Sequence, residues 1–166
     1  MIKLLIENQS NQDIPKELDL NGWLEKCLQI LKRANRGKSV IKEGVLEMYF
    51  VDSESIRKLN SEHRGKDSPT DVLSFSFLEG QKFPGDNLVG QIFLEPQIAQ
   101  KQALDHGVSW ADEIEFLFVH AVLHVFGYDH ENPEDFREMF GLQEKIMPDQ
   151  RWVNYADQIF REYFGQ

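Results

Sequence analysis

The sequence predicts an α+β fold, with a single mixed sheet of about four strands, helices packed against it, and a metal site on a helix and its following loop. Strand-like segments lie within the first 94 residues, whereas helical periodicity dominates the rest of the 166-residue chain. Hydrophobic residues make up 41% and charged residues 28%, as in soluble globular domains that bury a core. We expect one domain over residues 1–147 and a C-terminal extension over residues 148–166 that packs on it.

Four segments have the composition of β-strands. They alternate apolar and polar residues or are rich in β-branched and aromatic side chains, and turn-forming residues separate them. In chain order, these predicted strands cover residues 2–6, 45–51, 72–77 and 88–94.

Six further segments carry apolar residues at helical spacing. Ser53 is a candidate N-cap, Pro96 suits a first helical turn, and Ser109 with Asp112 forms a capping-box pattern whose helix should end at Gly127. The aromatic residues of the last helix are expected to pack in the core. The predicted helices begin near residues 20, 53, 96, 109, 133 and 151.

The net charge of −10 argues against loose electrostatic adhesion to nucleic acids or anionic membranes. The charge is uneven, because residues 103–166 hold 4 Lys and Arg against 13 Asp and Glu, whereas residues 1–102 hold 14 against 15. We therefore expect any site for a polyanion in the N-terminal part of the chain.

The single cysteine, Cys27, cannot form an internal disulfide and is expected to pack in the core. No apolar run reaches the length of about 18 residues that a membrane span needs, and the first residues are too short and acidic for a signal peptide. We therefore expect a cytoplasmic protein.

The strongest functional signal is the segment FLFVHAVLHVFGYDH, which places His120, His124 and His130 at the spacing H-x3-H-x5-H. Residues i and i+4 share a helix face, so the first two imidazoles can converge on one ion. Gly127 lets the chain turn back so that His130 adds a third nitrogen. Three ligands leave a fourth position open, which is typical of catalytic zinc, although nickel, copper or iron also accept nitrogen ligands. The alternative is a pair of core histidines bonded to backbone carbonyls.

The same spacing occurs in the metzincin proteases, whose motif is H-E-x-x-H-x-x-G-x-x-H. Here Ala121 takes the place of the glutamate that acts as general base in those enzymes. A metallohydrolase acting on peptides is therefore kept as an alternative.

With Ala121 between the histidines, HAVLHVFGYDH resembles the H-G-x-L-H-L-x-G-Y-D-H motif of the YbeY family of metal-dependent endoribonucleases. A second block also resembles this family. The family's L-N-x3-R matches Leu59, Asn60 and Arg64, and its T-D-V-L-S-F matches residues 70–75. A third block, Gly90-Gln91-Ile92, resembles a G-D-I segment with Gln91 in place of the aspartate. The resemblance covers roughly residues 45–147.

This resemblance implies a single-domain endoribonuclease over residues 1–147 that holds one zinc ion on the three histidines and cleaves single-stranded RNA. It also implies maturation of the 3′ end of small-subunit (16S-type) ribosomal RNA and a part in ribosome quality control. Ribosomal RNA and ribosome-associated proteins are the expected partners, and neither a membrane nor DNA is expected. A non-catalytic, ribosome-associated metal-binding module is a further alternative.

The resemblance also gives Arg64 a catalytic role, and a guanidinium can hold a phosphate through two hydrogen bonds and offset its growing charge. Thr70, Asp71 and Asp129 could contact a ligand or substrate, or could simply form turns. The remaining basic residues are candidates for RNA backbone contacts, or else form solvated surfaces and helix ends. These are Arg57, Lys58, Lys66, Lys32, Arg33, Arg36 and Lys38.

Overall fold

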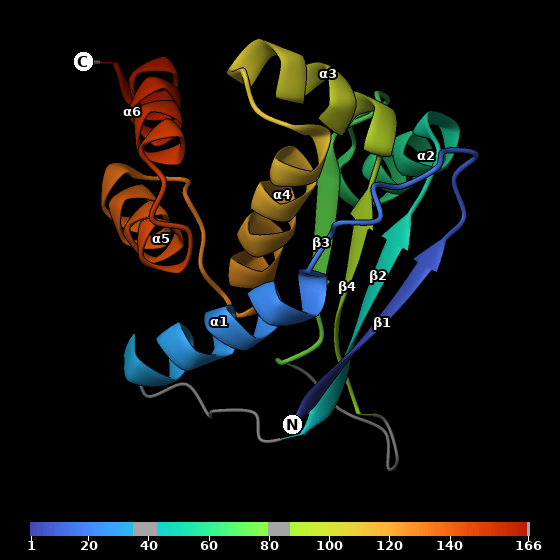
Figure 1. Cartoon of the computed structure of the whole chain (residues 1–166), viewed down its shortest axis with the longest axis horizontal. Coiled ribbons are helices and arrows are strands. Elements are labelled where there is room, and N and C mark those ends of the chain that lie inside the picture. The colour runs from blue at the N-terminus through green and yellow to red at the C-terminus, as the bar shows by residue number, and fades with distance from the viewer. Residues whose placement is uncertain (35–42, 80–86, 166) are drawn as a thin grey trace.

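A computed structural model describes residues 1–34, 43–79 and 87–165 and contains a mixed four-stranded sheet in the order β1-β2-β4-β3 (Figure 1). β1 pairs with β2 and β2 with β4 in parallel, whereas β3 runs antiparallel to β4. The strands are β1 (Ile2–Asn8), β2 (Gly44–Phe50), β3 (Val72–Ser76) and β4 (Leu88–Leu94). The predicted α+β class and its mixed sheet are confirmed.

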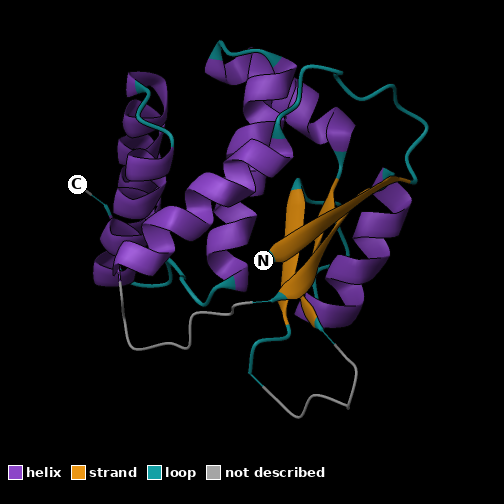
Figure 2. Ribbon diagram, turned by 60° about the horizontal axis from the view of Figure 1, so that its bottom comes forward, coloured by secondary structure: helices purple, strands orange, loops and turns teal. Residues whose placement is uncertain are grey.

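Helices cover both faces of this sheet, with α1 and α4 on one face and α2 on the other (Figure 2). α5 and α6 lie beyond α4, on the side away from the sheet (Figure 1). The helices in the described part of the chain are α1 (Leu20–Ala34), α2 (Ser53–Arg64), α3 (Pro96–His106), α4 (Trp110–Val125), α5 (Pro133–Ile146) and α6 (Gln150–Phe164).

The alternation along β2 divides the apolar residues between the two faces. Leu46 and Met48 are fully buried in the main core beneath α1 and α4. Tyr49 points the other way and packs with Ile56 of α2 and Leu73 of β3 in a second, smaller cluster. This period of two is what a sheet covered on both faces requires. Cys27 is also fully buried, so its predicted packing role is confirmed.

α4 is apolar on almost all sides because it is enclosed by the sheet, α1, α3 and α5. Its C-terminal end lies against β3 and β4, where the Ser76 hydroxyl donates a 2.7 Å hydrogen bond to the carbonyl of Val125. Gly90 makes this approach possible, since a Cβ there would lie 2.6 Å from the Val125 side chain. The sheet therefore fixes the position of the end of the helix that carries the histidine motif.

Some element boundaries differ from the predicted ones. Asp52 and not Ser53 caps α2, because its carboxylate accepts a 2.8 Å hydrogen bond from the backbone N–H of Ser55 and Ser53 already belongs to the helix. The first strand continues to Asn8 because its backbone pairs with β2 over the whole length. The capping box of Ser109 and Asp112 is present at the start of α4, as predicted.

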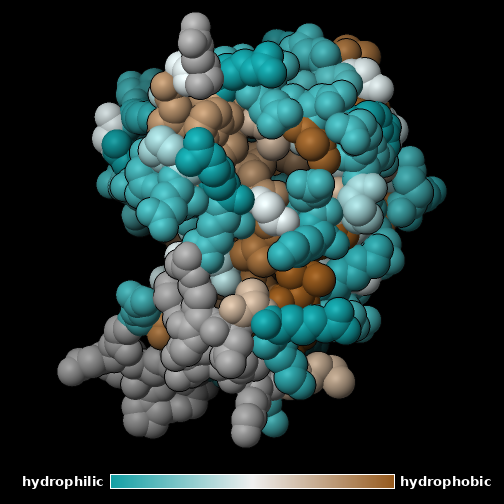
Figure 3. Space-filling model, turned by 90° about the vertical axis from the view of Figure 1, so that its left-hand side faces the viewer, coloured by the Kyte–Doolittle hydropathy of each residue, from teal (hydrophilic) through white to brown (hydrophobic). Residues whose placement is uncertain are grey.

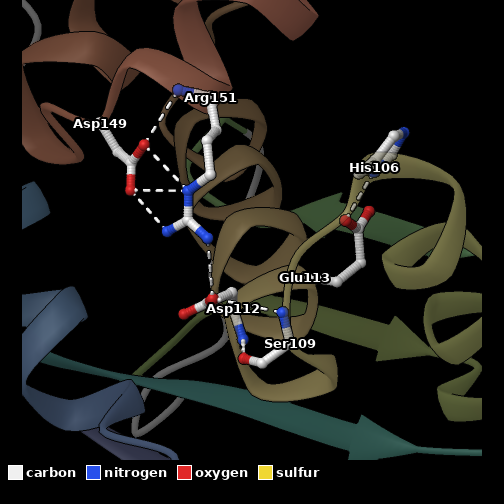
Figure 4. A network of polar contacts seen from close by, with 6 residues as sticks. All are labelled: His106, Ser109, Asp112, Glu113, Asp149 and Arg151. Atoms are coloured by element: carbon white, nitrogen blue, oxygen red, sulfur yellow. Dashed lines mark hydrogen bonds and ion pairs between the residues drawn. The ribbon is translucent and has the colours of Figure 1, made fainter.

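α6 is attached to the body by its N-terminal half. Arg151 holds Asp149 in an ion pair at 2.5 Å and reaches the carboxylate of Asp112 at the start of α4 at 3.3 Å (Figure 4). The ring of Trp152 stacks on Phe116 of α4, with the ring centroids 4.3 Å apart. Close by, the buried carboxylate of Glu113 forms a 2.7 Å contact with Nδ1 of His106 (Figure 4).

The aromatic residues of α6 do not all pack as expected. Trp152 is buried, but the side chain of Tyr163 is 65% exposed, so the expectation of core packing is wrong for Tyr163. The rings of Phe160 and Phe164 contact Phe136 of α5, whereas the ring of Tyr163 between them in sequence lies beside those of His130 and Phe164. The face that contains α5 and α6 is largely hydrophilic, with hydrophobic residues in its hollows (Figure 3).

None of the helices in the described residues is both long enough and apolar enough to cross a membrane.

Candidate metal centre

The three histidines of the motif converge at the end of α4. Nε2 of His124 lies 3.1 Å from Nε2 of His120, and one ring nitrogen from each of His120, His124 and His130 lies within 4.8 Å of the others. The first two side chains share a face of α4 because they are four residues apart. Gly127, with a φ of 89°, then turns the chain so that His130 returns toward the helix. The predicted convergence of the three side chains is thus observed, and this group could bind a metal ion.

A buried glutamine sets the orientation of the His120 ring. Nε2 of Gln143 donates to the carbonyl of Phe116 at 3.1 Å, so its Oε1 faces Nδ1 of His120, also at 3.1 Å. A carbonyl oxygen can only accept, so Nδ1 carries the hydrogen and Nε2 keeps its lone pair. Metal-ligating histidines are commonly held in this way.

The ring of His124 is oriented by the backbone. Its Nδ1 lies 2.9 Å from the carbonyl of Tyr128, which also can only accept a hydrogen bond. Nε2 of His124 therefore presents a lone pair toward Nε2 of His120. Two lone pairs 3.1 Å apart repel one another unless a cation lies between them.

Burial keeps both imidazoles neutral. Desolvation, followed by repulsion from His124, lowers the pKa of His120 to about 3. Desolvation, followed by repulsion from His130, lowers the pKa of His124 to about 4. At neutral pH both rings are unprotonated, which is the form that binds metals.

The three histidines line a cleft with a volume of about 1100 Å³. Arg64, the last residue of α2, lines the same cleft and is close enough to His124 to lower its pKa electrostatically. Gly65 ends α2 in a left-handed conformation with a φ of 68°, and the chain then brings Lys66 into the cleft. The structure therefore brings Arg64 together with the three histidines, although α2 and α4 are far apart in the sequence.

Thr70, Asp71 and Asp129 also line the cleft, and hydrogen bonds within the chain occupy them. One oxygen of Asp71 accepts from the backbone N–H of Val72 at 2.7 Å, and the other accepts from Gln102 at 3.2 Å. The Thr70 hydroxyl donates to Asp71 at 3.2 Å. The carboxylate of Asp129 accepts from the backbone N–H of His130 at 2.7 Å, so it stabilises the turn that carries this histidine.

In the described part of the chain, the other basic candidates do not line the cleft. Arg57 is held by the carboxylates of Glu54 and Asp67, and Lys58 lies 3.8 Å from Glu54. Lys32 and Arg33 occupy the last turn of α1, where positive charge is favourable to the helix dipole. Arg36 and Lys38 lie outside the described residues.

Three further residues contribute to this site that the sequence did not predict. Gln143 stands on the apolar face of α5 beside Met139 and Phe140, and a polar residue on such a stripe is the signal that could have identified it. Tyr155 and Tyr163 reach the cleft from α6, and nothing in their spacing distinguishes them from core aromatics.

Comparison with known proteins agrees with this geometry. The family described as Endoribonuclease YbeY matches residues 5–151. A protein of that name from Bdellovibrio bacteriovorus is 34% identical, with 86% of this chain and 91% of the relative covered. Another from Salinispora tropica is 38% identical, with 86% and 92% covered. A solution structure of a Thermotoga maritima protein has a TM-score of 0.52 at 25% identity, with 95% of each chain covered. The matched residues and these relatives show that the present chain belongs to the YbeY endoribonuclease family.

Proposed function

We propose that this protein is a metal-dependent endoribonuclease that cleaves single-stranded RNA during maturation of the 3′ end of small-subunit ribosomal RNA and in ribosome quality control. The observation that carries the proposal is the presence of Arg64 and three converging histidines in one cleft, in a chain of this family. We assign the activity to a domain over residues 1–147, with residues 148–166 as an extension, and place the protein in the cytoplasm with ribosomes.

Zinc is the proposed cofactor, one ion per chain, held by His120, His124 and His130. The donor set fits, because three neutral nitrogens suit zinc and leave one position open. Two nitrogens bound to a tetrahedral zinc ion at ~2.0–2.1 Å lie about 3.3 Å apart, and the Nε2 atoms of His120 and His124 are 3.1 Å apart. When bound, the ion supplies Lewis acidity toward the scissile phosphodiester.

Arg64 binds and orients the phosphate. Its guanidinium offers several N–H donors in a planar fork that matches two phosphate oxygens, and it offsets the negative charge that grows on them during cleavage. In the described residues no carboxylate pairs with Arg64, whereas two carboxylates hold Arg57 on the same helix. Arg64 is thus the α2 arginine that is available to RNA, with Lys66 as a second cationic contact.

The alternative functions lose their support. The residue that would act as general base in a metzincin is Ala121, whose side chain is buried and cannot accept a proton. The family assignment favours neither a peptidase nor a non-catalytic module. Ribosome-associated proteins remain proposed partners.

The test compares the wild type with three variants on a fragment of small-subunit ribosomal RNA precursor. We expect His124→Ala to abolish cleavage and Arg64→Ala to reduce it by about 10²–10³-fold, the usual cost of removing one charge-stabilising donor. Arg57→Ala is the matched control on the same helix and should cleave like the wild type. Circular dichroism establishes that each variant is folded, and mass spectrometry identifies the bound metal.

Equal cleavage by all four proteins would indicate a contaminating nuclease and refute the proposal. Failure of the wild type to cleave the fragment, alone and with ribosomes added, would refute it as well. Cleavage of casein without cleavage of RNA would establish the peptidase alternative.

A further inference from the structure

We propose that α6 carries a nucleobase subsite, in which the exposed ring of Tyr163 stacks on a base of the RNA next to the three-histidine centre. This inference rests on the proposed function, because it takes single-stranded RNA as the substrate. It assigns a substrate-binding role to a helix whose residues beyond 151 lie outside the family match.

α6 forms one wall of the cleft. Tyr155, Ile159, Glu162 and Tyr163 all line it, at positions that share one face of the helix. The ring centroid of Tyr163 is 6.1 Å from that of His130, one of the three converging histidines. A base that stacks on Tyr163 would therefore belong to a nucleotide at or beside the scissile phosphate.

The exposure of Tyr163 is what makes the ring available. Phe160 and Phe164 on the same helix are partly buried and contact Phe136 at ring distances of 5.3 and 5.7 Å. Tyr163 keeps 65% of its surface exposed while bordering the cleft. An exposed aromatic ring beside a phosphate-binding position is the arrangement that proteins use to bind single strands.

The distribution of charge in the cleft would orient a bound RNA strand. Arg64 and Lys66 reach the cleft from α2 and the residues after it, whereas the α6 wall carries the carboxylate of Glu162. Asp71, Asp129 and Glu131 also line the cleft, on the segments that join α2 to β3 and α4 to α5. Figure 1 shows α2 and α6 on opposite sides of α4. The phosphates are attracted to the cationic wall and repelled by Glu162, so the bases turn toward α6 and Tyr163.

α6 is also positioned before RNA binds. Besides the Trp152 stack and the Arg151 ion pairs, the ring of Tyr155 lies 4.1 Å from that of His106. A ring carried by a helix that is already attached to the body loses little conformational entropy on binding.

The experiment measures cleavage kinetics of a short single-stranded RNA by wild type and by Tyr163→Ala, Tyr163→Leu and Tyr163→Phe. We expect Tyr163→Ala and Tyr163→Leu to raise KM about tenfold, a loss of about 1.4 kcal/mol in binding free energy. The kcat of both variants should change less than about twofold. Phe keeps the stacking face and should match the wild type. Asn154→Ala, on an exposed position of α6 that does not line the cleft, is the control.

A second measurement separates this inference from the proposed function. Fluorescence anisotropy gives the affinity for a fluorescein-labelled RNA in EDTA, which stops metal-dependent cleavage. Tenfold weaker binding by Tyr163→Ala supports the subsite even if the wild type does not cleave. If the wild type cleaves and Tyr163→Ala has an unchanged KM, the subsite is refuted while the endoribonuclease proposal stands. If Tyr163→Phe loses as much RNA affinity as Tyr163→Leu, stacking is refuted.

Discussion

Replacing Gln143 with leucine tests whether the buried amide prepares His120 for metal binding. Gln143 is 2% exposed, and its Oε1 is the acceptor for the Nδ1 hydrogen of His120. Leucine has a similar volume and no polar atom, so the change removes the acceptor without opening a large cavity. The carbonyl of Phe116 loses a donor but remains within the hydrogen-bonded helix α4.

The magnitude follows from the tautomer of His120. Without Gln143 an Nδ1 hydrogen is left buried and unpaired, at a cost of about 1–3 kcal/mol. The ring avoids this cost by moving the hydrogen to Nε2, the nitrogen that faces His124. Metal binding must then restore the unfavourable tautomer, which weakens affinity by about 5–160-fold. This range agrees with the 10–100-fold effect usual for residues that support a metal ligand.

The assay is competition for zinc between the protein and a chromophoric chelator at neutral pH, with unfolding in urea and EDTA as a stability control. Gln143→Glu keeps an acceptor for His120, so it should bind zinc at least as well as the wild type despite its lower stability. If Gln143→Leu binds within twofold of the wild type, or if the Glu variant binds as weakly as the Leu variant, the reasoning is wrong.

Three other perturbations follow from the packing. Gly90→Ala places a Cβ 2.6 Å from the Val125 side chain, so the free energy of unfolding in urea should fall by about 1–3 kcal/mol; an unchanged midpoint would contradict this. Burial raises the pKa of Cys27 to about 12, so a thiol reagent should modify it only after unfolding. Desolvation raises the pKa of Glu113 despite its contact with His106, so this carboxyl favours folding when protonated and loses that contribution as pH rises. Glu113→Gln should therefore gain stability relative to the wild type with rising pH, and a constant difference in urea titrations would oppose this.

Features that depend on local spacing could be predicted from the amino-acid sequence. Apolar residues that recur every two positions predicted the strands, and those that recur every 3.6 positions predicted the helices. Capping residues then located most helix ends within a few positions. The candidate metal centre could be predicted for the same reason: two histidines four residues apart share a helix face, and Gly127 permits the turn that returns His130. All three histidines lie within one helix and its following loop, so no long-range contact was needed to predict that they converge.

The surroundings of the histidines depend on how distant segments pack, and local spacing does not predict them. Arg57 and Arg64 are both basic residues of α2, and packing alone places Arg64 at the cleft while ion pairs hold Arg57. Gln143 and Tyr163 reach the site from α5 and α6, which meet α4 through aromatic contacts between distant segments. Periodicity shows which face of a helix is apolar, but it does not show which distant element covers that face, because that depends on how all the layers pack.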